Sequence, residues 1–111
     1  MGAAAIPDDE SARLESLRSR DILDTPPEDD FDDIVRMAAE LCDVPIALVS
    51  LVDEHRQWFK AKIGLDVDET PRELAYCAHA ILGDSLMEVP DASVDPRFAD
   101  NPLRTGPPFA T

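Results

Sequence analysis

The stretch PIALVSLVDEHRQWFKAKIGL, residues 45–65, constrains the fold more than any other part of this chain. Residues 46–52 are almost continuously apolar and contain both Ile and Val, which is typical of a strand that is covered on both faces. Residues 56–64 follow a predicted turn at 53–55 and alternate between the two sides of a second strand. One side is expected to carry Trp58, Lys60 and Lys62, and the other Phe59, Ala61 and Ile63. The stretch therefore predicts a β-hairpin.

A short helix is predicted near the start of the chain, over residues 11–23. Its apolar side has only Leu14, Leu17 and Ile22. An isolated helix of this length is marginal in water, so we expect it to dock on another part of the chain.

A longer helix is predicted between the sequence TPPE, residues 25–28, and Asp43. Thr25 can be the N-cap, Pro26 the first helical residue and Glu28 the reciprocal partner of a capping box. The helix is expected to stop near Asp43, because a proline follows two residues later. Apolar residues recur through the segment at helical spacing: Phe31, Ile34, Val35, Ala38, Leu41 and Cys42.

The second half of the chain repeats the capping pattern in TPRE, residues 70–73. A helix is predicted through LAYCAHAIL, residues 74–82, and a short strand within residues 86–92. Asp95 is expected to cap a helical turn that begins at Pro96.

Composition narrows the function classes. The 111 residues are enough for one domain, and 24 acidic against 10 basic residues give a net charge of -14. Such a surface repels phosphate backbones and anionic lipid, so we expect no nucleic-acid partner and no membrane-surface binding. No apolar run approaches the roughly 20 residues that span a bilayer. The start lacks the basic region of a secretory signal, and the two cysteines suit the reducing cytoplasm.

The sequence YCAHAI, residues 76–81, could belong to a metal site, a catalytic pair or a pocket wall. On a helix, residues two apart point about 200° away from each other, so Cys77 and His79 are not expected to chelate one ion or to act as nucleophile and base. A zinc site needs further ligands, and only Cys42 and His55 remain among the Cys and His residues. We favour a buried thiol over a reactive one at Cys77, and a partly buried histidine that lines a cleft at His79.

Several motifs taken together resemble those of GAF domains in bacterial sensor histidine kinases, diguanylate cyclases and related signalling proteins. They are ILDTPPE, VPIALVSLVDE, RQWFKAKIGL, CAHAI and DPRFADNP. The resemblance implies an α+β fold with a central antiparallel sheet, helices packed on one face and a ligand cleft on the other. Residues 1–10 are expected to be a flexible segment, and residues 11–111 a partial GAF domain.

The family continues with two further strands after GPP, residues 106–108, and one of them lies beside the first hairpin strand. We therefore expect a fold that is incomplete at its C-terminus. The strand at 46–52 is too apolar for an exposed edge, which predicts a homo-oligomer.

The resemblance implies that Trp58, Cys77 and His79 line or support the cleft, and Asp91 offers a further polar contact there. The expected function is a regulatory sensor or binding module with no chemistry of its own, which acts with a signalling partner or effector domain. Two alternatives remain: a thiol-dependent reductase of free methionine sulfoxide, and a bare dimerisation or docking domain. The sequence identifies no cofactor and no metal ligands, and it leaves the small-molecule ligand open among cyclic nucleotides, small metabolites and haem.

Overall fold

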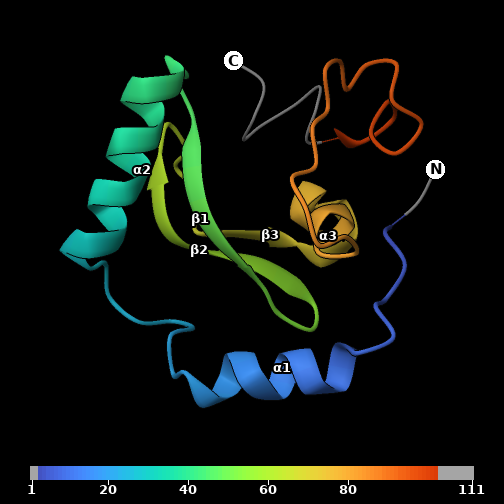
Figure 1. Cartoon of the computed structure of the whole chain (residues 1–111), viewed down its shortest axis with the longest axis horizontal. Helices are drawn as coiled ribbons and strands as arrows, with labels where there is room; N and C mark the ends of the chain where they lie inside the picture. Colours follow the sequence, from blue (N-terminus) through green and yellow to red (C-terminus); the bar gives the residue numbers. More distant parts are fainter. Residues whose placement is uncertain (1–2, 103–111) are drawn as a thin grey trace.

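The computed structural model describes residues 3–102 and arranges three α-helices around a three-stranded antiparallel sheet (Figure 1). The predicted α+β class is confirmed. The strands are β1 (Ala47–Val52), β2 (Arg56–Ile63) and β3 (Glu69–Pro71). The helices are α1 (Glu10–Ser19), α2 (Asp29–Cys42), the 3-10 turn η1 (Arg72–Leu74) and α3 (Tyr76–Ala80). None of the helices in this described part is long and apolar enough to cross a membrane.

The predicted hairpin is confirmed, but its alternation is not. Along the β1–β2 ladder Val49 lies opposite Ala61, whereas the next residue, Ser50, lies opposite Phe59. Lys60 is therefore the extra residue of a β-bulge, which bends the strand and re-aims its side chains. Neighbouring residues Val49 and Ser50 point to opposite faces of the sheet, so their partners Ala61 and Phe59 do as well, and the expected division of this strand into two alternating sides is wrong. Residues 57–61 are all buried.

Strand β1 lies at an edge of the sheet, because the order within the described residues is β1-β2-β3. Its residues 47–51 are only half-buried, so the strand is less well covered than its composition predicted. The short strand expected within residues 86–92 is absent: residues 86–89 have no regular secondary structure, and Leu86 is 91% exposed.

The capping box expected at the start of the long helix is wrong, because α2 begins four residues after Thr25. The Thr25 hydroxyl instead donates to the carbonyl of Ile22 and accepts from Lys60. Tertiary contacts thus outcompete the local cap. The other end is as predicted: the helix stops at Cys42, and Asp43 adopts a left-handed conformation with φ 52°.

The second predicted capping box, at residues 70–73, does not cap a helix either. Thr70 is buried in β3, where its Oγ1 accepts a hydrogen bond of 3.1 Å from Gln57 Nε2, and α3 starts only at Tyr76. The turn after Asp95 is confirmed, since the carboxylate accepts a 2.9 Å hydrogen bond from the Arg97 backbone N–H.

The core lies between the sheet and the helices that surround it. Its buried apolar residues are Leu14, Val35, Val52, Trp58, Phe59, Ala61, Leu65, Ala75, Ala78 and Phe98. At the end of the hairpin Gly64 has φ +85°, and a Cβ there would lie 2.2 Å from the carbonyl oxygen of Pro45. Only glycine permits this backbone approach, which brings the end of β2 against the segment that leads from α2 into β1.

Candidate functional site

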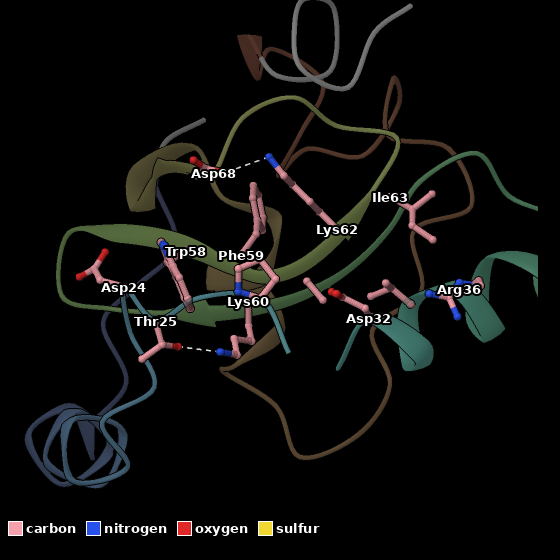
Figure 2. Close-up of a pocket in the computed structure, with 13 residues that line it drawn as sticks. Asp24, Thr25, Asp32, Arg36, Trp58, Phe59, Lys60, Lys62, Ile63 and Asp68 are labelled. Atoms are coloured by element: carbon pink, nitrogen blue, oxygen red, sulfur yellow. Dashed lines mark hydrogen bonds and ion pairs between the residues drawn. The ribbon is translucent and has the colours of Figure 1, made fainter. Parts of the chain in front are cut away.

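A cavity of about 620 Å³ lies between α2 and β2 (Figure 2). Its floor is formed by the bulged strand, and α2 supplies one wall. We call it the α2–β2 cavity. It is lined by Asp24, Thr25, Pro27, Asp32, Val35, Arg36, residues 58–63 and Asp68.

Lys60 is the most deeply buried charge at this cavity, and its side chain is 0% exposed. Its Nζ donates to Thr25 Oγ1 at 2.6 Å and to the Pro26 carbonyl at 2.7 Å, and it lies 2.6 Å from Glu28 Oε2. It also lies 5.7 Å from the centre of the Phe31 ring. Because an ammonium has three donors, Lys60 is fully occupied in fixing the segment before α2 and has none left for a ligand.

The other cations at the cavity are nearer to solvent. Lys62 Nζ donates to the Val67 carbonyl at 2.9 Å and to Asp68 at 2.8 Å, as Figure 2 shows for the aspartate. Arg36 on α2 pairs with the exposed Asp33 at 2.7 Å. Exposed ion pairs of this kind are weak, so both cations can exchange their partners for a ligand. The cavity thus combines an aromatic floor at Trp58 with a rim of mixed charge.

A second cluster forms where the turn after Asp95 meets α3. Phe98 is fully buried, stacks on Tyr76 with ring centroids 4.2 Å apart, and meets the His79 ring edge-on at 5.0 Å. Arg97 lies 5.1 Å from the centre of the Phe98 ring. We call Tyr76, His79, Asp95, Arg97 and Phe98 the α3 cluster.

Charges in the α3 cluster are balanced internally. Burial, together with the nearby Arg97 guanidinium, lowers the pKa of His79 below its ordinary value. Hydrogen bonds from the Arg97 side chain and backbone lower the pKa of Asp95 to about 2, and the two side chains lie 2.7 Å apart. At neutral pH this places an uncharged imidazole against an aromatic ring, beside a fixed ion pair.

The other two predicted site residues, Cys77 and Asp91, belong neither to the α2–β2 cavity nor to the α3 cluster. Cys77 lines a groove between α1, β1 and α3, where its sulfur accepts a 3.2 Å hydrogen bond from the Ser50 hydroxyl. Asp91 accepts a 3.0 Å hydrogen bond from the Ser93 backbone N–H, which is typical of a turn. Within residues 3–102, no three His, Cys, Asp or Glu side chains are placed to hold a metal ion.

The structure therefore does not gather the four predicted residues around one cavity. Trp58 lines the α2–β2 cavity, whose walls include neither Cys77, His79 nor Asp91. His79 contacts Phe98, which lies in the turn after Asp95. Whether any of the four contacts a ligand stays a prediction.

Sequence reasoning missed the polar residues that line the α2–β2 cavity. The sequence places Lys62 on one side of a predicted strand and Arg36 within a predicted helix, and it does not indicate that the two line one cavity. The available signal was a pair of lysines within a buried strand beside an acid-rich helix start. Buried or half-buried lysines need partners, which points to a polar crevice at that junction.

Comparison with known proteins identifies the family. The family model for the GAF domain matches residues 26–109. A cyclic di-GMP phosphodiesterase of Pseudomonas aeruginosa is 43% identical over 108 residues, which are 97% of this chain but only 18% of that protein. The chain thus spans less than a fifth of the length of this relative. Because the family model covers most of its residues, the chain belongs to the GAF domain family.

Proposed function

We propose that this chain is the regulatory GAF module of a bacterial signalling protein, and that the enzyme it controls acts on cyclic di-GMP. One observation carries the proposal: nearly the whole chain is similar to a small part of a cyclic di-GMP phosphodiesterase. A segment that makes up 18% of such a protein leaves most of its length for other domains. Among the effectors that the resemblance implied, this relative favours enzymes of cyclic di-GMP turnover over histidine kinases.

The arrangement of the candidate groups supports a module with no chemistry of its own. A nucleophilic thiol needs a base within hydrogen-bond reach. Cys77 is instead bonded to a neutral hydroxyl, while His79 packs on Phe98 and carries a lowered pKa. These contacts disfavour the methionine sulfoxide reductase alternative.

The regulatory assignment can be tested by a domain exchange. The matching segment of the Pseudomonas aeruginosa phosphodiesterase is first deleted and then replaced by this chain. We expect deletion to change kcat/KM for cyclic di-GMP hydrolysis at least threefold and the replacement to restore it. The isolated chain should hydrolyse none. Turnover by the isolated chain, or a phosphodiesterase indifferent to the deletion, would contradict the proposal.

We further propose that a small molecule binds in the α2–β2 cavity, against Trp58. The volume of about 620 Å³ falls within the range of small-molecule sites, and an aromatic floor with a few polar groups is their usual lining. Trp58 is the only tryptophan, so its fluorescence reports on this cavity alone. Nucleotides and small metabolites are screened against that signal.

Matched variants then locate the ligand. Arg36→Ala and Lys62→Met remove two cations of this cavity, whereas His79→Ala and Asp91→Ala change two predicted site residues that lie outside it. Weaker binding in the first pair alone supports the α2–β2 cavity. Weaker binding in the second pair alone would move the ligand to the region that the sequence predicted.

The proposed setting is the cytoplasm, and the proposed assembly is a homo-oligomer. Within residues 3–102, β1 has a partner strand on one side only, which supports self-association, since an unpaired strand edge is a template for pairing. Light scattering on the purified chain at micromolar concentration measures this directly, and a monodisperse monomer would contradict it.

A further inference from the structure

One charged side chain at the α2–β2 cavity has no partner of opposite charge. The charged residues that line this cavity are Asp24, Asp32, Arg36, Lys60, Lys62 and Asp68. All of these except Asp32 are ion-paired: Asp24 with Arg56, Arg36 with Asp33, Lys60 with Glu28, and Lys62 with Asp68. Within residues 3–102, the Asp32 carboxylate makes neither an ion pair nor a hydrogen bond. The cavity therefore carries one uncompensated negative charge.

Asp32 differs from the other acids at the start of α2. Asp29 and Asp30 are exposed, whereas Asp32 is half-buried, and Figure 2 shows its carboxylate directed from α2 toward β2. All three can offset the helix dipole, but of the three Asp32 alone lines the cavity. A partly buried charge without a partner is unfavourable, so this position favours a positively charged group of a ligand. One carboxylate supplies too few oxygen atoms for a metal ion, whereas it suits a single ammonium group.

Arg36 offers the opposite charge on the same helix. It follows Asp32 by four residues, which places their Cβ atoms about 5–6 Å apart on one face of the helix. Its guanidinium lies 2.7 Å from Asp33, but both side chains of this pair are 61% exposed, so the pair is weak and can be exchanged. A guanidinium binds a carboxylate through two parallel hydrogen bonds. The cavity wall thus offers an acceptor for an ammonium beside a donor for a carboxylate.

We propose that the small molecule of the α2–β2 cavity is a zwitterion, namely an α-amino acid with an apolar side chain. Its ammonium lies on Asp32, its carboxylate replaces Asp33 on Arg36, and its side chain packs toward β2, where Trp58 and Ala61 line the cavity. This inference rests on the ligand site proposed above and adds the chemical class of the ligand.

Three probes with the same phenyl group test the inference. L-phenylalanine carries both charged groups, phenethylamine only the ammonium, and 3-phenylpropionate only the carboxylate. Each is titrated into the full chain while heteronuclear NMR follows the indole N–H signal of Trp58, the only tryptophan. We expect L-phenylalanine to bind at least about tenfold more tightly than either fragment, because each fragment lacks one hydrogen-bonded ion pair.

Variants then assign each charged group. Asp32→Asn should weaken binding of L-phenylalanine and phenethylamine about tenfold and leave 3-phenylpropionate unchanged. Arg36→Gln should weaken L-phenylalanine and 3-phenylpropionate and leave phenethylamine unchanged. The matched control is Asp30→Asn, which removes the same charge from the same helix outside the cavity and should leave all three affinities unchanged. Circular dichroism checks that the variants keep their helix content.

The inference is overturned if L-phenylalanine does not change the Trp58 signal, or binds no more tightly than the fragments. It is also overturned if Asp32→Asn has no effect, or if Asp30→Asn weakens binding as much, since the net negative charge of the chain would then explain the attraction. The ligand site itself is judged separately. A fragment, nucleotide or metabolite that changes the Trp58 signal when L-phenylalanine does not would retain the site and reject the zwitterion.

Discussion

The two longest helices among the described residues, α1 and α2, are attached to the sheet by different forces. Helix α1 buries only Leu14, so its attachment to the sheet depends mainly on polar contacts. Its Glu10 pairs with Arg72, a residue 7% exposed, and its Arg13 donates to the carbonyl of Val52 at the end of β1. Helix α2 is attached by apolar packing of Val35 and by the buried Lys60, which fixes the segment leading into it.

This difference predicts different responses to solution conditions. An ion pair weakens when its carboxylate takes up a proton, whereas apolar packing has no group that titrates. Helix α1 should therefore loosen before α2 when the pH is lowered. A module that carries a signal benefits from one element that moves while another stays fixed.

The largest effect is expected where α2 and the hairpin meet, at Gly64. Gly64→Ala forces a side chain into a left-handed position and against the Pro45 carbonyl, which would lie 2.2 Å from the new Cβ. We expect a loss of roughly 3–4 kcal/mol in the free energy of unfolding, with α1 and α2 lost together. Urea denaturation followed by Trp58 fluorescence measures it. Gly83→Ala is the control, because a Cβ there meets nothing within 4 Å; equal losses in the two variants would refute the steric argument.

A smaller effect is expected on the α2 side alone. Lys60→Met keeps most of the side-chain volume but leaves Thr25 and the Pro26 carbonyl without their donor. We expect a loss of about 2 kcal/mol in the free energy of unfolding. Lys62→Met is the matched control: Lys62 is 28% exposed and its partner Asp68 82% exposed, so it should cost under about 1 kcal/mol. If both variants lose the same amount, burial of Lys60 is not what makes it important.

The smallest effect on global stability, but the most selective one, is expected at Glu10. Its pKa is lowered, first by the hydrogen bond with Arg72. The stabilisation from this carboxylate is therefore present above its ordinary pKa of 4.5 and is lost as the pH falls through the lowered value. Glu10→Gln should cost about 1 kcal/mol at neutral pH and abolish the acid-induced loosening of α1.

Amide chemical shifts in α1 and α2, followed by NMR from pH 7 to pH 3, separate the two helices. In the unsubstituted chain we expect the α1 signals to change first. Arg36→Gln, which removes an exposed pair on α2, is the control and should leave this order unchanged. Simultaneous loss of both helices would show that the two attachments are not independent.

The sequence was sufficient for the hairpin, because the apolar run and the turn that predict it are local features, and the family resemblance was sufficient for the fold class. It also predicted the end of α2 near Asp43 and the turn after Asp95. The start of α2 was predicted three residues too early, because the cap residue Thr25 is drawn into a hydrogen bond with Lys60, 35 positions away.

The candidate site was harder to predict than the fold. A single extra residue in β2 redirects the side chains around it, and nothing in the alternating pattern of RQWFKAKI signals where that residue lies. The α2–β2 cavity depends on this bulge and on contacts between distant segments. Trp58 was predicted as a pocket residue, but its polar neighbours come from three other parts of the chain.

Arg56 connects three segments of the chain mechanically. Its guanidinium binds both carboxylate oxygens of Asp24, at 2.9 and 2.7 Å, and also lies 3.5 Å from Asp53 and 3.1 Å from Glu69. One rigid planar group thus joins the linker after α1, the tip of the hairpin and the start of β3. A pull on the N-terminal helix that displaces Asp24 therefore loads the start of β2, the tip of the hairpin and β3 together, through a single side chain.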